Sequence, residues 1–218
     1  MNRFFFSLVL LSGLVSFSRG EDKGPPSGFD ALFNGKDLTG WKVFDGKMTA
    51  WGADNGILFV SGGGGGWLMT EKEYGDFELR LEYKVPAKGN SGVALRAPLK
   101  GNPAYEGMEI QILDDPWYKD PANYKSIRPT QLTGSIYDVV PPSKDALKPT
   151  GDWNAMRITA KGRQVTIEIN GSKIVDANLD DYKEKAKAHP GLLRDKGHLG
   201  LQSHDGRVEF RNIYVKAG

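Results

Sequence analysis

Apolar and polar residues alternate along most of this chain from Phe29 onward, the pattern of β-strands that bury one face. The clearest run is Phe77 to Val85, where apolar residues at odd positions alternate with charged ones. Turn residues recur about every ten residues, a spacing typical of an antiparallel sandwich or barrel. Further strands are predicted at 57–60, 93–97, 108–113, 154–160, 199–203 and 208–216. We therefore predict an all-β fold.

Local signals add a hairpin, a helix and several loops to this pattern. Asn170-Gly171 separates two alternating runs and predicts a type I′ turn, which needs positive φ at both residues. Residues 180–188 are expected to form one short surface helix, because two aspartates begin the segment and Pro190 follows it. The glycine run 62–66 lacks the residues of a phosphate-binding loop and is predicted to be a flexible connection. Long loops at 114–129 and 141–149 are expected to carry binding residues.

The first twenty residues have the layout of a secretory signal peptide. Arg3 precedes an apolar run from Phe4 to Val15, and small residues follow it up to Gly20. The run is shorter than the roughly 20 apolar residues that span a bilayer. We expect cleavage before Glu21; cleavage after Ser18 or retention as an interfacial anchor are the alternatives. The predicted organisation is a signal peptide at 1–20, a flexible lead-in at 21–28 and one domain at 29–216, giving a periplasmic or secreted protein without a membrane partner.

Charge and composition narrow the function further. The 218 residues carry 29 basic and 27 acidic side chains, and the formal charge of +2 is due to Arg3 and Arg19 of the predicted signal peptide. A neutral mature chain gives no support to a nucleic-acid partner. Cysteine is absent, so a metal would need oxygen or histidine ligands. The histidines show no zinc spacing; His189 is expected to be exposed, His198 structural, and His204 is the candidate for chemistry.

Polar side chains share one face of three predicted strands, and small residues interrupt them. Such stripes suit a sugar, whose hydroxyls need hydrogen-bond donors and acceptors; the alternative is an ordinary solvated face. The period of two places on these faces Glu109 with Gln111, Arg96 with Gly92 and Ala94, and Gln202 and His204 with Gly200.

The 114–129 loop adds aromatic and acidic candidates. Trp117, Tyr118 and Tyr124 would provide a platform for the C–H face of a sugar, with plain packing as the alternative. Asp114 is a candidate hydrogen-bonding group, and together with Asp115 it would suit a hard cation or form a solvated turn. Ordinary glycoside hydrolysis uses two carboxyl groups across the scissile bond, and here Gln111 stands where a second acid would be convenient.

Eight segments, in order, resemble the 3-keto-disaccharide hydrolase domain family, formerly a domain of unknown function. The resemblance covers roughly residues 29–216. The segments are LFNGKDLTGW (32–41), YGDFELRLEY (74–83), NSGVALR (90–96), YEGMEIQILDD (105–115), TGSIYD (133–138), DWNAMRI (152–158), GHLGLQSH (197–204) and VEFRNIYVK (208–216).

The resemblance implies a concanavalin A-like jelly roll of two antiparallel sheets, and a hydrolase for glycosides already oxidised at C3 of the sugar. A C3 ketone acidifies the C2 hydrogen, so one base, an enolate stabiliser and water suffice for elimination and rehydration. We expect Glu109 or His204 to be the base and Arg96 to hold the enolate. The resemblance allows a divalent metal in place of Arg96, without requiring a cofactor. The expected substrate-binding residues are Gln111, Asp114, Gln202, Trp117 and Tyr124.

Two other functions fit the same sequence. A non-catalytic, lectin-like module would bind glycans with the same polar strands, and an adhesive or structural role would leave those strands without a purpose. The enzyme reading implies a small carbohydrate substrate and an upstream sugar 3-oxidoreductase that supplies the ketone.

Overall fold

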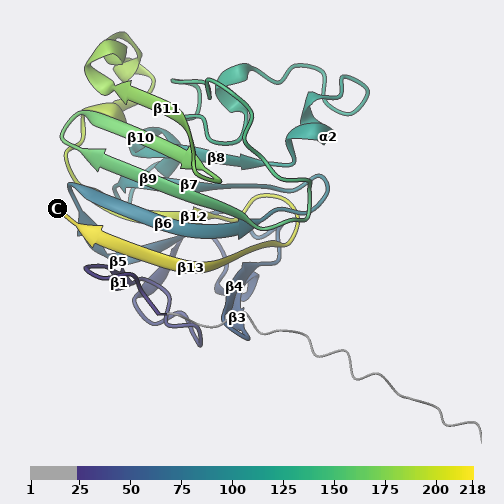
Figure 1. The fold of residues 1–218 in the computed structure, drawn as a ribbon, viewed down its shortest axis with the longest axis vertical. Helices are drawn as coiled ribbons and strands as arrows, with labels where there is room; N and C mark the ends of the chain where they lie inside the picture. The colour runs from purple at the N-terminus through teal and green to yellow at the C-terminus, as the bar shows by residue number, and fades with distance from the viewer. Residues whose placement is uncertain (1–23) are drawn as a thin grey trace, which may run out of the picture.

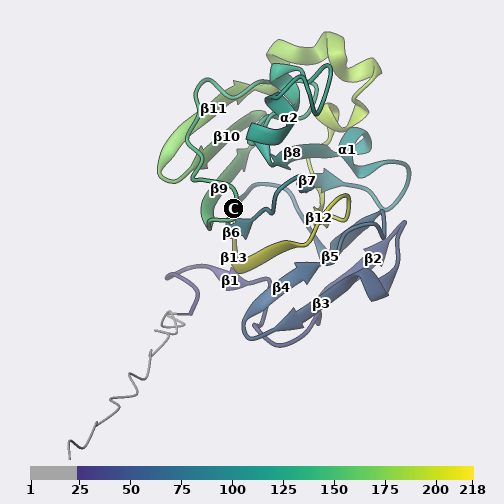
Figure 2. The ribbon, with the colours of Figure 1, turned by 90° about the vertical axis from the view of Figure 1, so that its right-hand side faces the viewer.

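The computed structural model describes residues 24–218, and the predicted signal peptide lies outside them. Two antiparallel sheets pack face to face, with the larger in front in Figure 1 and both seen from the side in Figure 2. Sheet A contains, in spatial order, β11 (Ser172–Asn178), β10 (Gln164–Ile169), β9 (Asn154–Lys161), β6 (Phe77–Lys84), β13 (Val208–Ala217), β4 (Ile57–Val60) and β3 (Trp51–Asp54), with β1 (Asp30–Ala31) beside β13. Sheet B contains β2 (Trp41–Phe44), β5 (Trp67–Tyr74), β12 (Gly197–Gln202), β7 (Asn90–Ala97) and β8 (Met108–Leu113).

The core lies between the two sheets and takes every second side chain of their strands. On β6, Leu79 and Leu81 are buried in it, and on β8 Ile110 and Ile112 meet them from the opposite sheet. Each such side chain stabilises the fold by about 1.5–3 kcal/mol when it leaves water. Because alternate residues of a strand point to opposite faces, Glu109 and Gln111, which flank Ile110 on β8, point to the outer face of sheet B.

The predicted strands and the predicted hairpin are confirmed. Asn170 has φ of 51° and Gly171 φ of 78°, the two positive values of a type I′ turn, between β10 and β11. The short strands β1, β2 and β3 and the longer strand β5 were not predicted. The first four residues of β5, Trp67 to Thr70, are all buried and do not alternate. The glycine run 62–66 connects β4 to β5, as expected of a linking segment.

Helical structure is short and lies outside the sheets. The predicted helix is a 3-10 helix, η3 (Leu179–Lys187), with a kink at Tyr182, and not an α-helix. The single helix expected from the sequence is accompanied by other short turns, namely α1 (Pro103–Glu106), α2 (Asp115–Lys119), η1 (Met48–Ala50), η2 (Pro129–Gln131) and η4 (Pro190–Leu193). Within residues 24–218 no helix has the length and apolar character needed to cross a membrane.

The strand β7 loses its alternation at Arg96. This residue has φ of 49°, and the pairing of β12 with both neighbouring strands shifts register between His198 and Gly200. The irregularity turns the Arg96 side chain away from the face that carries Gly92 and Ala94. The prediction that Arg96 shares their face is therefore wrong, because a period of two holds only while the strand stays regular.

The Arg96 side chain instead connects the two sheets at one end of the sandwich. Its guanidinium is fully buried and donates to the carbonyl oxygens of Gly75 at 3.0 Å, Gly162 at 2.8 Å and Arg194 at 3.3 Å. Its Nη2 also pairs with Asp76 at 3.3 Å. Gly75 and Asp76 lie in the turn from β5 to β6, and Gly162 in the turn from β9 to β10. Arg96 thus provides hydrogen bonds to carbonyl oxygens of Gly75, Gly162 and Arg194, which lie outside the β-strands.

We expect Arg96→Met to destabilise the protein by about 3 kcal/mol or more, because three carbonyl acceptors and a carboxylate lose a buried donor. Urea denaturation followed by tryptophan fluorescence measures the loss. The matched control is Arg207→Met, since the Arg207 side chain is half exposed and should change stability by less than about 1 kcal/mol. Equal stability losses in both variants would contradict the structural role of Arg96.

Candidate functional site on the outer face of sheet B

Glu109 lies on the outer face of sheet B with its carboxyl group over a glycine. In the ladder between β7 and β8, Glu109 pairs with Ala94 and Gln111 pairs with Gly92. A Cβ atom at Gly92 would stand 2.0 Å from Glu109 Oε1, a distance that no side chain allows. The carboxyl therefore occupies the space that the missing Gly92 side chain leaves.

The Glu109 carboxyl is enclosed and chemically perturbed. The residue is 3% exposed, and Oε1 has no hydrogen-bond partner within residues 24–218. Burial, and to a smaller degree the charge of Asp138, raises the pKa of Glu109 from its ordinary 4.5 to about 8. A carboxyl with this pKa exchanges a proton near neutral pH, as a general acid or base must.

Gln111 stands beside Glu109 on the same face of β8 and has a fixed orientation. Its Oε1 accepts the backbone N–H of Ile112 at 2.9 Å. Because a backbone N–H needs an acceptor, this bond assigns the amide oxygen and turns the Nε2 group the other way. The residue is 4% exposed, so sequence-predicted Glu109 and Gln111 are together, and both are buried where a solvated face was the alternative.

Small and apolar residues continue the face across the neighbouring strands. Gly200 of β12 pairs with Ala94 on one side and with Met69 of β5 on the other. A Cβ at Gly200 would meet Met69 Sδ at 2.3 Å. Next to this row, the predicted Gln202 pairs with Trp67, and its Oε1 is enclosed without a partner in the described chain. An apolar floor with polar groups at its sides suits the mixed surface of a sugar ring.

A second group of polar and aromatic residues borders Glu109, and the sequence analysis missed it. The Tyr105 ring, from α1, lies 5.1 Å from the His189 ring and 6.3 Å from the Tyr137 ring. The Tyr137 N–H donates to the Glu109 carbonyl oxygen at 2.9 Å. Asp138 follows directly and pairs with Arg128 at 2.6 Å. The segments 105–115 and 133–138 carried the family resemblance, so the signal was present but could not show that they meet.

His189 departs from its predicted exposure. It is 7% exposed and packs against Tyr105 just before η4, and burial lowers the pKa of its imidazole. The prediction failed because the charged 3-10 helix before it was taken as evidence of a solvated segment. His198 is structural as predicted, with Nδ1 at 2.8 Å from the carbonyl oxygen of Thr70.

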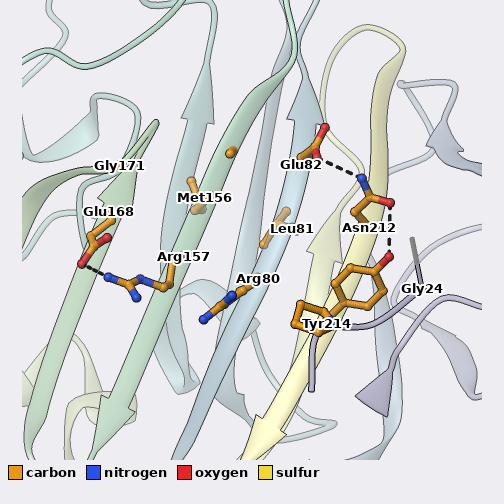
Figure 3. A pocket seen from close by; sticks show the side chains of 12 residues that line it. Gly24, Arg80, Leu81, Glu82, Met156, Arg157, Glu168, Gly171, Asn212 and Tyr214 are labelled. Atoms are coloured by element: carbon orange, nitrogen blue, oxygen red, sulfur yellow. Dashed lines mark hydrogen bonds and ion pairs between the residues drawn. The ribbon is translucent and has the colours of Figure 1, made fainter. Parts of the chain in front are cut away.

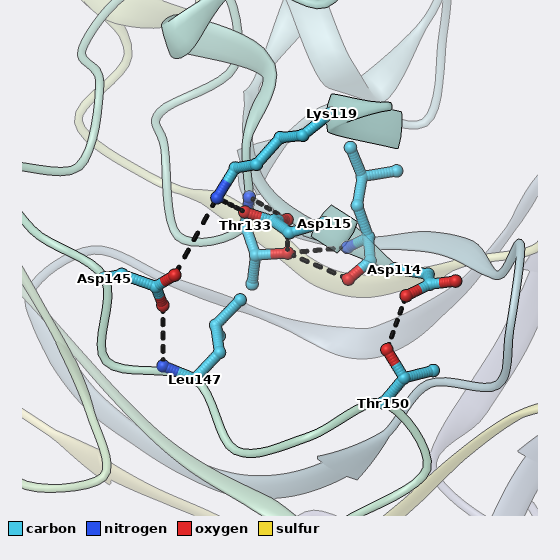
Figure 4. A network of polar contacts seen from close by, with 8 residues as sticks. Asp114, Asp115, Lys119, Thr133, Asp145, Leu147 and Thr150 are labelled. Carbon is cyan, nitrogen blue, oxygen red and sulfur yellow. Dashed lines mark hydrogen bonds and ion pairs between the residues drawn. The ribbon is translucent and has the colours of Figure 1, made fainter. Parts of the chain in front are cut away.

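Asp114 does not lie on the Glu109 face. One of its carboxyl oxygens accepts the Lys88 N–H at 2.8 Å, and the other accepts the Thr150 hydroxyl at 2.5 Å (Figure 4). Asp115 accepts the Thr133 hydroxyl at 2.6 Å. Both aspartates are buried, so the solvated turn is also excluded. Asp114 holds the two loops at Lys88 and Thr150 to the end of β8, and Asp115 holds the segment at Thr133. Asp114 is thus a structural residue, which corrects its assignment to substrate binding.

The predicted aromatic residues pack on one another around α2. The Trp117 and Tyr118 rings are 4.8 Å apart, and the Tyr118 and Tyr124 rings are 5.2 Å apart. Tyr124 is 42% exposed, so this cluster presents a ring edge to solvent beyond the end of β8. The rings pack on one another, and the sugar platform at Trp117 and Tyr124 stays a prediction.

His204 is placed at the same end, away from Glu109. Its Nδ1 lies 2.7 Å from Asp205 Oδ2, and both side chains are half exposed. Asp205 pairs with Asn90 at the start of β7, whereas Glu109 pairs with Ala94. Four residues of a strand span roughly 13 Å. The structure therefore does not bring the two predicted base candidates, Glu109 and His204, together, and only Glu109 is enclosed.

A groove of about 570 Å³ lies on the outer face of sheet A, but the charged side chains that line it are paired with one another or with neighbouring polar groups (Figure 3). Arg157 pairs with Glu168, and Asn212 donates to Glu82 at 2.9 Å. Mutual pairing leaves these groups little capacity to bind a ligand, whereas the Glu109 carboxyl retains an unpartnered oxygen. We place the candidate site on sheet B for this reason.

The donor set around Glu109 does not fit a metal centre. No group of three or more histidine and acidic side chains that could hold a metal ion occurs within residues 24–218. The neighbours of Glu109 are an amide, tyrosines and an aspartate already paired with Arg128.

Comparisons with known proteins identify the family and the fold. A family model described as a 3-keto-alpha-glucoside-1,2-lyase-like domain matches residues 28–216. A Bacteroides thetaiotaomicron protein named 3-keto-disaccharide hydrolase is 27% identical over 228 residues, which cover 87% of this chain and 78% of the relative. The crystal structure of a putative glycosyl hydrolase from Parabacteroides distasonis is 28% identical with a TM-score of 0.76, covering 88% of this chain and 94% of that one.

One more distant structure bears on the fold alone. A carbohydrate-binding module from Bacillus subtilis has a TM-score of 0.54 at 14% identity and covers 82% of this chain and 96% of its own. Together with the two antiparallel sheets, such likenesses confirm the predicted jelly-roll class.

The raised pKa of Glu109 predicts a pH-dependent cost to stability. Between pH 4.5 and about 8, Glu109 holds a proton in the folded protein that it has lost in the unfolded chain. The contribution of this protonated carboxyl to folding stability is therefore complete below pH 4.5 and is lost as the pH rises through about 8. Glu109→Gln lacks the ionisation. We expect the variant to gain stability relative to the wild type from pH 5 to pH 9, by up to a few kcal/mol, since one pKa unit is about 1.4 kcal/mol.

Chemical denaturation at several pH values measures this difference. Glu71→Gln is the matched control, because Glu71 is exposed on β5 and its replacement should change stability by less than about 0.5 kcal/mol. A constant difference for Glu109→Gln would show that Glu109 titrates as an ordinary carboxyl.

Proposed function

This chain belongs to the 3-keto-alpha-glucoside-1,2-lyase-like domain family, and from that premise we propose that it cleaves glycosides or disaccharides whose sugar carries a ketone at C3. The family and its named relatives support a glycoside hydrolase-like activity. The ketone and the elimination chemistry are the finer parts of the proposal. Glu109 is the base.

The observation that carries the proposal is the presence of one perturbed carboxyl where direct glycoside hydrolysis uses two. Glu109 is enclosed with a pKa of about 8, while the neighbouring Asp138 is held by Arg128 at 2.6 Å. The next outward position on β8 is the amide Gln111. A single base of raised pKa suits removal of a proton from carbon, because basicity rises with pKa.

The proposed reaction has three steps. The Glu109 carboxylate takes the proton of C2, and the electrons of that C–H bond form a C2=C3 double bond while O3 becomes an enolate. The enolate reforms the ketone, a C1=C2 double bond forms, and the C1–O bond breaks; the leaving oxygen takes a proton from Glu109 or water. Water then adds its oxygen to C1 and a proton to C2. The sum is hydrolysis of the glycoside.

The setting of this activity is also a proposal. The signal-like sequence at residues 1–20 supports export to the periplasm or beyond. Since ordinary sugars carry a hydroxyl at C3, an oxidation by a sugar 3-oxidoreductase must precede the reaction.

Non-catalytic sugar binding is the second candidate. The likeness in fold to a carbohydrate-binding module favours it, but the fold alone does not decide activity. An enclosed carboxyl of raised pKa would be a cost to a binding module with no compensating gain.

We expect purified mature protein to release monosaccharide from a 3-keto-disaccharide and not from the unoxidised parent. Glu109→Gln should lower kcat by at least about 100-fold, because an amide cannot accept the C2 proton. In the wild type, kcat/KM should rise with pH up to about 8 and then level, as the base becomes ionised. Sugar release is followed by chromatography.

Glu71→Gln is the control for the substitution itself and should keep wild-type turnover, because Glu71 is exposed on β5. His204→Asn tests the other predicted base; a loss equal to that of Glu109→Gln would move the chemistry to the His204 end. Binding of both sugars with release from neither would establish the binding module instead.

Gly92→Ala tests the position of the carboxyl without removing it. The new methyl group would stand 2.0 Å from Glu109 Oε1 and 2.8 Å from its Cδ and Cγ, so we expect the side chain to rotate away and turnover to fall by about tenfold or more. The fold should be retained, because the closest clashes are with one side chain and not with backbone. Thermal unfolding and turnover measured together check this; unchanged kcat would show that the carboxyl does not need its place over Gly92.

A further inference from the structure

The loss of Arg96 from the site leaves the enolate of the proposed reaction without its expected partner. Arg96 is fully buried between the turns at one end of the sandwich, and carbonyl oxygens and Asp76 take up its donors. A negative charge that develops on O3 needs a hydrogen-bond donor held in place before the reaction. Such a donor must come from another side chain near Glu109.

Gln111 offers such a donor, and the backbone fixes its direction. The Ile112 N–H donates to Gln111 Oε1 at 2.9 Å, so the oxygen side of the amide is occupied. The Nε2 group makes no hydrogen bond within residues 24–218 and is not among the enclosed unpartnered atoms of that part of the chain. The Gln202 amide oxygen is enclosed without a hydrogen-bond partner in the described part of the chain, so no bond to that oxygen sets the orientation of its amide.

The spacing of Glu109 and Gln111 matches the two reacting ends of a 3-keto sugar. Two residues apart on one strand face, their backbones are separated by roughly 7 Å. A base lies about 3 Å from the proton it removes, and an oxyanion donor about 3 Å from its oxygen. C2 and O3 are only two bonds apart, so a base and a donor at neighbouring outward positions of one strand can act on the same sugar. The residues that pair with them on β7 are small: Ala94 lies opposite Glu109, and Gly92 lies opposite Gln111.

We propose that the Gln111 Nε2 group is the enolate-stabilising donor, in place of Arg96. It donates to the C3 ketone oxygen in the bound substrate and more strongly to the enolate oxygen that forms when Glu109 takes the C2 proton. The inference rests on the proposed function. Gln111 is then a catalytic residue, and its effect falls on the chemical step more than on binding.

Gln111→Glu tests this with little change of shape. The new carboxylate still accepts the Ile112 N–H but replaces the Nε2 donor with an oxygen. We expect kcat for sugar release to fall by about 100- to 1,000-fold while KM changes by less than about threefold, as for other lost oxyanion donors. Deuterium uptake at C2 of free 3-keto-glucose in D2O, followed by NMR, should fall in parallel, because it reports enolate formation alone.

Two measurements separate this role from its alternatives. A second carboxylate near Glu109 could act by changing the ionisation of that base, so activity is measured from pH 6 to 9.5; recovery at high pH would overturn the donor role. A higher KM with kcat within tenfold of the wild type would make Gln111 a binding residue only. Gln164→Glu, at an exposed position on β10 of the other sheet, is the control and should leave kcat and C2 exchange unchanged.

Thermal unfolding first establishes that Gln111→Glu is folded. If it is not, Gln111→Met takes its place, because methionine has a similar length but neither the amide oxygen nor the amide nitrogen. The wild type distinguishes failure of the inference from failure of the function beneath it. Wild-type protein that neither releases sugar nor exchanges the C2 hydrogen would refute the proposed function, and the role of Gln111 with it. Wild-type activity that survives in the folded Gln111 variant would refute only the role of Gln111.

Discussion

The register between β7 and β8 is the constraint on which the site depends. Glu109 opposite Ala94 and Gln111 opposite Gly92 put two polar side chains over the two smallest neighbours that the strand offers. A slip of one residue would turn Ile110 and Ile112 outward and carry the polar pair into the core. Burial of the isoleucines thus fixes the position of the carboxyl, so the energy that folds the sandwich also holds the reactive group in place.

The same enclosure gives Glu109 its chemical character. A carboxyl at a solvated strand face would be ionised and well hydrated at neutral pH, and therefore a weak base. Over Gly92, with Oε1 unpartnered in the described chain, the charged form loses its hydration and the pKa rises to about 8. The cost in stability at high pH and the gain in basicity have a single physical cause.

Arg96 and Asp114 show how polar residues near a site become part of its support. Both were expected to touch substrate, and both are buried with their hydrogen-bonding capacity used inside the protein. Arg96 satisfies carbonyl oxygens in turns of both sheets, and Asp114 holds the loops at Lys88 and Thr150 to the end of β8. Such residues position the strands that carry Glu109 without meeting the ligand. The residue type and its position in the sequence do not distinguish a substrate-binding role from a structural one. The hydrogen-bond partners in the folded protein do.

The sequence by itself determined most of the longer strands, the Asn170-Gly171 turn and the common face of Glu109 and Gln111, because alternation and turn chemistry are local properties of the chain. It could not find the bulge at Arg96, since a shift of register depends on the partner strand β12. Nor could it join Tyr105, Tyr137 and His189, which come from three distant segments. Only tertiary structure decided which polar groups were enclosed, because desolvation depends on what all the other segments cover.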